Sequence, residues 1–310
     1  MEKELKDKLE NAKLEDILTF VYVLVDDIYL NLSHYANRPG ITPSFTDSEV
    51  ITLSLVNQMF SNSEASFHRF VKRNYLHLFP NLTDRTRYHR RCKSLSQIIN
   101  LIRLDLLQKM DCHLQIHHVI DSMPVPVCVY ARAARNLNFA CQFNIDNDSL
   151  YGHCAAKNMD YYGMKLHLMV TAQGIPVHFV LAAAAHHDVV IAPELIESYR
   201  QQIAILGDKG YVGIDKRLQK SVDYQLIVQK RENQKVPNTE YEKTYLALFR
   251  KTIETTNAQL AGQFNLQFTR AKSARGLCSR IIYKITAHTM AIFLNFLADR
   301  PLLEIKNLLL

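Results

Sequence analysis

The stretch His117-His118-Val119-Ile120-Asp121-Ser122-Met123-Pro124-Val125-Pro126-Val127 decides the fold. Its β-branched, apolar run predicts a buried strand that carries Asp121 at its rim and then stops at proline. The stretch Ile203-Ala204-Ile205-Leu206-Gly207-Asp208-Lys209-Gly210-Tyr211 repeats the order of apolar strand, acid and glycine turn. A carboxylate at the end of a core strand is costly unless something pairs it, so we expect Asp121 and Asp208 to lie close together.

A third acid, Glu254, lies in a segment that is predicted to be helical. Two acids on strands and one on a helix form an oxygen-only ligand set that suits Mg²⁺ or Mn²⁺. Carboxylates about 4 Å apart repel by about 1 to 4 kcal/mol, and divalent cations relieve that repulsion. Two such ions can activate an attacking oxygen and stabilise the leaving oxygen in an in-line phosphodiester displacement. The expected catalytic and metal-binding residues are Asp121, Asp208 and Glu254.

Together with Tyr161-Tyr162-Gly163-Met164-Lys165-Leu166-His167-Leu168 and Arg250, these residues resemble the DDE transposases of bacterial insertion sequences, most closely the insertion-sequence 982 family. The resemblance runs roughly from Arg85 to the C-terminal helices. It implies that Asp121 bridges two ions while Asp208 and Glu254 hold one each. Some related transposases also carry a tyrosine and a lysine around this arginine and glutamate. Ala247 and Ala261 stand there instead, which leaves any hairpin-forming or base-flipping step open.

The order of predicted elements is strand, hairpin, helix, strand, helix, strand and then the helix of Glu254. This is the order expected of an RNase H-like α/β fold, which the resemblance also implies. We expect a five-stranded mixed sheet with flanking helices within residues 113–310, the C-terminal helices included. The hairpin is predicted at 164–170 and 175–183, a helix with Pro193 in its first turn at 191–201, and strands at 203–206 and 224–228. Residues 127–160 are predicted to be a long loop.

Residues 1–112 are predicted to form a helical DNA-binding region. An amphipathic helix is expected around residues 17–28, a second helix after the capping box Thr46-Asp47-Ser48-Glu49, and a third at 98–110. Basic and aromatic residues gather at 67–93 with Asp84 as the single acid, which favours contact with DNA phosphates. A helix-turn-helix stays open, because no glycine lies between Asn74 and Thr83, and a solvated basic face is the alternative. The DNA-binding residues expected here are Arg85, Arg87, Arg90, Arg91 and Lys93.

A second basic segment lies near the C-terminus. No acid occurs from residue 255 to residue 298, while basic residues accumulate up to Lys284. One-signed charge is unusual for a merely solvated helix, so this face is expected to border the DNA. Arg250 and Glu254 share a helix face and form at least an ion pair, and the resemblance makes Arg250 a phosphate or carboxylate organiser. The further DNA-binding residues expected are Lys165, Lys209, Arg250, Arg270, Lys272, Arg275 and Arg280.

Composition limits the possible functions. The 310 residues are 48% hydrophobic and 22% charged, enough for a full core, and the net charge of +7 favours a polyanionic partner. The six cysteines show no regular spacing and are expected to be free thiols in the cytoplasm, with no membrane association. In His186-His187-Asp188 a structural or capping role for Asp188 is favoured over metal ligation, and His113, His117 and His118 lack partners at zinc spacing.

These features predict a transposase that binds the terminal inverted repeats of its insertion sequence. It would cleave the DNA strand and join the 3′ ends to target DNA, using two Mg²⁺ or Mn²⁺ ions. Its partners would be double-stranded element ends and target DNA in the bacterial nucleoid, and pairing two ends calls for a homodimer or larger complex. The alternatives are a metal-dependent nuclease without strand transfer and a non-catalytic DNA-binding regulator.

Overall fold

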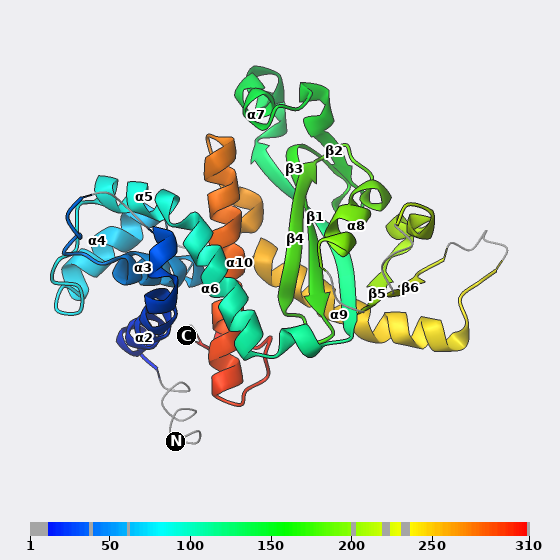
Figure 1. The fold of residues 1–310 in the computed structure, drawn as a ribbon. Coiled ribbons are helices and arrows are strands. Elements are labelled where there is room, and N and C mark those ends of the chain that lie inside the picture. Colours follow the sequence, from blue (N-terminus) through cyan, green and yellow to red (C-terminus); the bar gives the residue numbers. More distant parts are fainter. Residues whose placement is uncertain are drawn as a thin grey trace. The chain divides into compact units, whose positions relative to one another are not determined.

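The computed structural model describes residues 12–36, 40–60, 63–199, 203–218, 224–230 and 236–308. The chain divides into two compact units, which Figure 1 draws in sequence colours. Unit 1 comprises Met1–Met110, Gln263–Asn265 and Cys278–Leu310, and unit 2 comprises Asp111–Gly262 and Leu266–Leu277. The predicted boundary near residue 112 lies at the first junction. The C-terminal helices, however, were expected in the catalytic domain, and Cys278–Leu310 belongs with the N-terminal helices instead.

Unit 1 is helical. Its helices are α2 (Leu14–Leu32), α3 (Asp47–Met59), α4 (Glu64–Asn74), α5 (Arg85–Ser94), α6 (Ser96–Lys109) and the larger part of α10 (Ala274–Leu297). The predicted capping box of α3 is confirmed, because Thr46 Oγ1 accepts the Glu49 N–H at 3.2 Å and Glu49 Oε2 accepts the Thr46 N–H at 2.5 Å. The predicted helices around 17–28 and 98–110 are confirmed as α2 and α6.

The apolar stripe of α2 faces the core of unit 1. Its buried side chains are Ile17, Leu18, Val21, Val25 and Ile28. The stretch Leu14–Ala36 is long and apolar enough to cross a membrane by length and composition, and this burial is the alternative explanation for its hydropathy.

The C-terminal helix belongs to unit 1 because its side chains complete that core. Ile285, Met290 and Ile292 of α10 are fully buried. The Tyr283 hydroxyl donates to the Cys92 carbonyl at the end of α5, and Thr286 Oγ1 donates to the Ile99 carbonyl of α6 at 3.5 Å. The sequence could not show this, since an apolar helix at the end of a chain can complete either core.

Unit 2 is built on a mixed sheet of β1 (His117–Cys128), β2 (Tyr151–Cys154), β3 (Met159–Thr171), β4 (Pro176–Ala183), β5 (Ile203–Gly207) and β6 (Tyr224–Val228). The spatial order is β4-β3-β1-β5-β6, with β2 paired to the first residues of β3. β1 pairs antiparallel with β3 and parallel with β5, and β5 pairs parallel with β6. This order fits an RNase H-like domain. The five predicted strands are confirmed in position, and β2 makes a sixth.

Residues 127–160 are not the long loop that was predicted. They contain α7 (Leu137–Phe143), three 3₁₀ turns and β2. Tyr162 explains part of this order: its ring is fully buried, and its single hydroxyl proton is shared between Asn147 Oδ1 at 2.6 Å and the Asn136 carbonyl at 3.0 Å. One strand residue therefore ties down two points of the segment, a long-range effect that periodicity does not report.

β1 also differs from the prediction, because it runs through Pro124 and Pro126 instead of stopping there. The His117 carbonyl accepts the Ala172 N–H at the end of β3, and the Ile116 carbonyl accepts the Ala204 N–H of β5. The backbone N–H and carbonyl groups of the odd-numbered residues of β1 therefore point toward β3. Those of the even-numbered residues point away from β3, toward the side where β5 pairs. β5 ends opposite Ile120. Pro124 and Pro126 are even-numbered, so the N–H that each proline lacks would point to a side of β1 where no described strand pairs with it.

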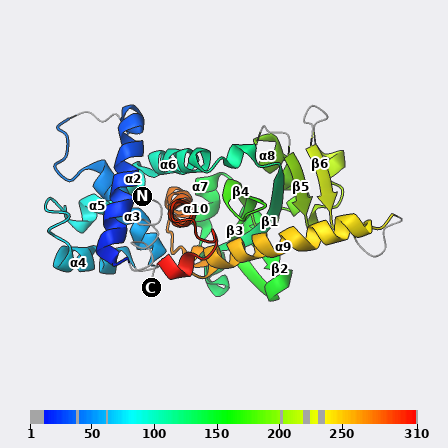
Figure 2. The ribbon, with the colours of Figure 1, turned by 90° about the horizontal axis from the view of Figure 1, so that it is seen from below.

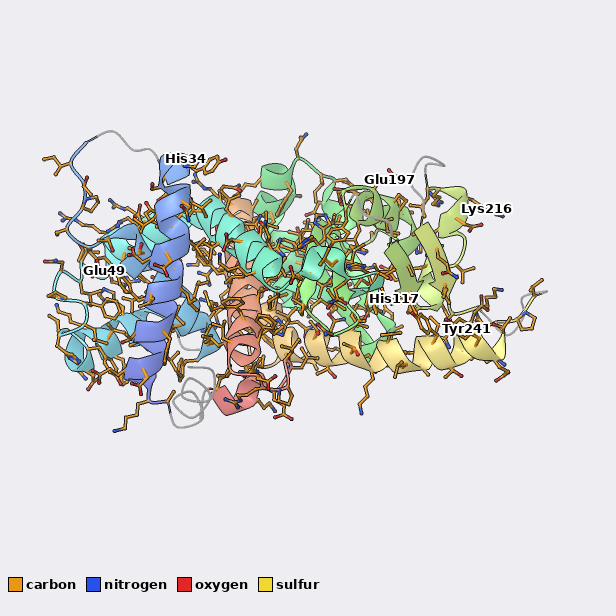
Figure 3. All side chains as sticks on the ribbon, turned by 60° about the horizontal axis from the view of Figure 1, so that its bottom comes forward. His34, Glu49, His117, Glu197, Lys216 and Tyr241 are labelled. Carbon is orange, nitrogen blue, oxygen red and sulfur yellow. The ribbon has the colours of Figure 1, made fainter. Side chains whose placement is uncertain are left out.

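Helices α8 (Asp188–Glu197) and α9 (Glu240–Ala261) cover opposite faces of the sheet, as Figure 2 shows. Consecutive residues of β1 confirm it: the ring of His117 stacks on Phe249 of α9, whereas His118 packs against Tyr199, just beyond α8. Figure 3 shows His117 beside α9. α8 begins at Asp188, earlier than predicted, so Pro193 lies inside the helix and not in its first turn.

Candidate functional site

Asp121 lies on β1 at the point where its parallel neighbour ends. β5 pairs with residues up to Ile120, so Asp121 and Ser122 are the first residues of β1 beyond it. The Ser122 N–H donates to Asp121 Oδ1 and Asn257 Nδ2 of α9 donates to Oδ2, both at 2.8 Å. Burial raises the pKa of Asp121 to about 7, and repulsion from Asp208 and Asp188 adds to the rise, while the two hydrogen bonds oppose it.

Asp208 follows β5 directly and caps the 3₁₀ turn η6 (Lys209–Tyr211). Its Oδ1 accepts the Gly210 N–H at 2.8 Å. Burial raises the pKa of Asp208, Asp188 raises it further, and the Gly210 hydrogen bond and Arg250 act in the opposite direction. A Cβ atom on Gly210 would lie 3.0 Å from Asp208 Oδ1 and 3.3 Å from Asp188 Oδ2. The glycine therefore lets two carboxylates approach the same turn.

Glu254 lies on α9 and is paired with Arg250 one turn earlier. Arg250 Nε donates to Glu254 Oε1 at 2.7 Å, and Arg250 Nη1 donates to Gln229 Oε1 just after β6 at 3.2 Å. The two side chains are 57% and 56% exposed. An exposed pair at this spacing contributes only about 0.3–0.5 kcal/mol, so Glu254 can exchange Arg250 for another cation at little cost.

The three predicted acids line one pocket. A cavity of 60 Å³ is bordered by Asp121 and Asp208 from the two strand ends and by Arg250 and Glu254 from α9. Among the residues that the structure describes, no three His, Cys, Asp or Glu side chains are close enough to form a ready metal site. The acids therefore converge on a shared cavity, while Glu254 is bonded to Arg250.

Asp188 has the structural role that was favoured over metal ligation, but its partners were not predicted. Its Oδ1 accepts hydrogen bonds from Ser122 Oγ and Lys165 Nζ, both at 3.0 Å. The fully buried His167 ring lies 4.0 Å from the same oxygen. Asp188 therefore contacts β1 and β3 on the face opposite α9 and repels both Asp121 and Asp208. The sequence signal for this contact was Ser122, which directly follows Asp121 and whose hydroxyl lies on the face of the sheet that α8 covers.

Asn257 was also missed. It lies three residues after Glu254, so the two side chains are neighbours on the surface of α9. The side-chain amide of Asn257 donates the hydrogen bond to Asp121 Oδ2. The helical spacing of Glu254 and Asn257 was visible in the sequence, but only the packing of α9 against β1 shows which carboxylate Asn257 meets.

Lys165 occupies a different place from the one predicted. It was expected to contact DNA, but its ammonium donates to Asp188 and to the His186 carbonyl at 3.0 Å, and its side chain is 17% exposed. An interior ion pair of this kind is costly to break, because the partner carboxylate would be left without a cation. Lys165 therefore supports Asp188. Lys209 and Arg250, by contrast, lie at an open cavity.

The basic patch of unit 1 is mostly exposed. Arg85, Arg87 and Arg90 project from α5 and Lys93 is half-buried. Arg91 is the exception: it donates to Asp47 Oδ1 at 2.7 Å and to the Phe45 carbonyl at 2.5 Å, with 13% of its side chain exposed. Arg91 therefore forms an internal ion pair, and its contact with a phosphate stays a prediction. The connection between α4 and α5 runs from Tyr75 to Asp84, longer than the three to four residues of a helix-turn-helix turn.

The C-terminal basic segment is not one surface. Arg270, Lys272 and Arg275 are exposed in unit 2, whereas Arg280 is half-buried in unit 1. Lys284 was grouped with this segment because of its charge. It is only 8% exposed, and its ammonium donates to the Phe264 carbonyl at 2.5 Å. Burial lowers the pKa of Lys284 to about 8. Charge alone could not separate this buried lysine from its exposed neighbours.

Comparison with known proteins gives one match. Residues 112–274, more than half of the chain, match a family model described as a transposase DDE domain. The matched segment contains both acid-bearing strands, α8 and α9. No curated protein and no solved structure matches the chain.

Proposed function

Since the chain belongs to the transposase DDE domain family, we propose that it cuts DNA at the terminal inverted repeats of its own element and joins the 3′ ends to target DNA. Asp121, Asp208 and Glu254 act as the three carboxylates of that reaction. The observation that carries the proposal is the single cavity bordered by all three acids, which come from two strand ends and a helix. The assignment to the insertion-sequence 982 family remains part of this proposal.

The donor set fits a divalent metal. Carboxylate oxygens are the ligands that Mg²⁺ and Mn²⁺ prefer. Burial, with a smaller contribution from neighbouring carboxylates, raises the pKa values of Asp121 and Asp208, and a bound cation would lower them. When bound, two such ions supply activation of the attacking oxygen and stabilisation of the leaving oxygen. Asp121, Asp208 and Glu254 would hold them.

The surrounding residues fix these acids in place. Asn257 and the Ser122 N–H fix both oxygens of Asp121, and the Gly210 N–H fixes Asp208. Pre-set carboxylates lose little freedom when they bind a cation, which favours a reactive geometry. Arg250 neutralises Glu254 before the site is loaded and is then free to contact a DNA phosphate.

The test compares strand cleavage with DNA binding. Asp121→Asn, Asp208→Asn and Glu254→Gln keep the shape of each side chain and remove a charge. A labelled duplex that carries the element's end, identified from inverted repeats in the flanking DNA, is assayed for nicking, for joining and for a gel shift with Mg²⁺ or Mn²⁺. We expect binding to survive and cutting to fail. Each single change should cost nearly as much as all three, since the groups act as one unit.

The control variant is Glu194→Gln, an exposed acid on α8. Glu242 is unsuitable, because its carboxylate completes the capping box of α9 and also accepts Asn238 Nδ2 at 3.2 Å. Cutting without joining by the unmodified protein would mean a nuclease that does not transfer strands. Normal cutting by Glu254→Gln would remove Glu254 from the site, and binding without cutting in either metal would replace the enzyme by a regulator.

A further inference from the structure

A second, larger cavity adjoins the acid pocket. It has a volume of 540 Å³, which is within the range of about 300–1,000 Å³ typical of ligand sites. Gln229, Leu246 and Arg250 line both cavities, so the two lie side by side along α9. The remaining lining residues are Lys209, Lys230, Pro237, Asn238, Lys243 and Ala247.

Among the described residues, the lining carries positive charge only. These residues include three lysines and one arginine, and no acid. Lys243 pairs with Glu240 at 2.7 Å, but the side chains are 56% and 88% exposed, so the pair is weak and easily exchanged. Within the described part of the chain, Lys209 and Lys230 have no carboxylate within ion-pair distance. Two of the four cations are held only by exposed pairs, Arg250 with Glu254 and Lys243 with Glu240, and together with Lys209 and Lys230 they favour an anionic ligand.

The wall of this cavity is fixed by Asn238, which is 9% exposed. Its Oδ1 accepts the Lys230 N–H at 2.7 Å, and its Nδ2 donates to the Val228 carbonyl at 3.1 Å and to Glu242. Glu242 in turn accepts the Thr239 N–H at 2.9 Å at the start of α9. These bonds join the end of β6 to α9 and hold the backbone of Lys230, so the position of this lysine is set before any ligand arrives.

We propose that this cavity binds the DNA strand beside the scissile phosphodiester, with backbone phosphates on Lys209, Lys230 and Lys243. The inference rests on the proposed function, because it takes the acid pocket as the place of cleavage. Arg250 lies at the junction and contacts the phosphate between the two cavities. Leu246 and Ala247 of α9 offer an apolar floor for the attached sugar, and lysines read backbone charge without sequence preference.

The experiment measures binding in EDTA, so that cleavage does not contribute. Lys230→Ala with Lys243→Ala is compared with the control Lys216→Ala with Lys251→Ala, two exposed lysines of unit 2 that do not line the cavity. Lys216 is labelled in Figure 3. The ligand is a fluorescent duplex that carries the element's end. Each lost phosphate contact lowers the slope of log affinity against log salt by about 0.9, so the cavity variant should lose about two and the control close to none.

A second series locates the contact. An uncharged methylphosphonate placed next to the scissile position should weaken binding of the unmodified protein at least fivefold and leave the cavity variant unaffected. One placed ten nucleotides away should weaken both proteins equally. Equal losses at the near position, or equal salt slopes in the two variants, would overturn the inference. Displacement of the duplex by free ATP at equal phosphate concentration would also overturn it, because the cavity would then be a nucleotide site.

The two proposals fail separately. If the cavity variant binds DNA normally while Asp121→Asn abolishes cutting, the acid site stands and this cavity is not part of the DNA path. If Asp121→Asn still cuts, the proposed function fails whatever the lysine variants show.

Discussion

The raised pKa of Asp121 predicts that the metal-free protein loses stability as the pH rises. The carboxyl titrates at about 7 in the native protein, against an ordinary value of 3.8. Below 3.8 it is protonated in both states and has no effect. Between the two values the unfolded chain releases the proton while the native protein keeps it, so the free energy of unfolding falls with pH until the loss is complete above pH 7.

The expected magnitude follows from these two values. A difference of about 3 pH units at about 1.4 kcal/mol each gives about 4 kcal/mol as an upper bound, since the carboxyl is only partly buried. Asp121→Asn keeps the size of the side chain and removes the titration. Relative to the native protein, its free energy of unfolding in EDTA should therefore increase by about 2–3 kcal/mol between pH 5 and pH 8.

Urea unfolding of both proteins at several pH values measures this difference, and Glu194→Gln serves as the control with the native pH dependence. Millimolar Mg²⁺ should restore stability to the native protein at pH 8 and have little effect on Asp121→Asn, because only the native site offers the full set of carboxylates. The reasoning is refuted if Asp121→Asn and the native protein lose stability in parallel from pH 5 to pH 8.

Three further predictions concern the rest of the chain. Arg91→Met should lower the stability of unit 1 by about 3–5 kcal/mol in urea unfolding, because Asp47 would be left buried without its cation, whereas a surface arginine should cost almost nothing. Lys284→Met should leave the salt dependence of DNA binding unchanged. The pKa of Lys284 is lowered to about 8 from its ordinary value of 10.5, so between pH 8 and pH 10 the native protein has lost a proton that the unfolded chain still binds. The native protein should therefore gain stability relative to the variant as the pH rises through this range. Gly163→Ala should reduce the melting temperature by several degrees, because its Cβ would lie 2.4 Å from the Val125 carbonyl and force β1 and β3 apart.

The sequence predicted the strands and helices that carry the acids, because apolar runs and periodicity show which residues are buried, whichever segment buries them. β1 was cut short at its prolines, since the sequence does not show that β5 ends opposite Ile120 and leaves the far side of β1 unpaired. The same limit explains β2, which pairs with the first residues of β3 only after a long polar segment has been ordered by Tyr162.

Asp121 and Asp208 could be proposed from the sequence because each follows an apolar run, and Glu254 because it lies four residues after Arg250 in a segment predicted to be helical. Their supports could not be, because they come from other elements: Asn257 from α9 and Asp188 from the start of α8. Basic residues were the least predictable. Arg91, Lys165 and Lys284 carry the same charge as Arg90 and Lys209, and only the fold shows that the first three are bonded inside a unit.

The part of β1 beyond β5 has a consequence for self-association. A bare strand in the middle of a sheet would accept a strand from another molecule if it offered both N–H donors and carbonyl acceptors. On this side the Ser122 N–H is already taken by Asp121, and Pro124 and Pro126 have none to give. From Ser122 to Pro126 the open side therefore presents acceptors without free donors, and an incoming strand could form only half of its ladder. The residues that keep the carboxylate in position therefore also leave this side of β1 without the donors that an incoming strand would need.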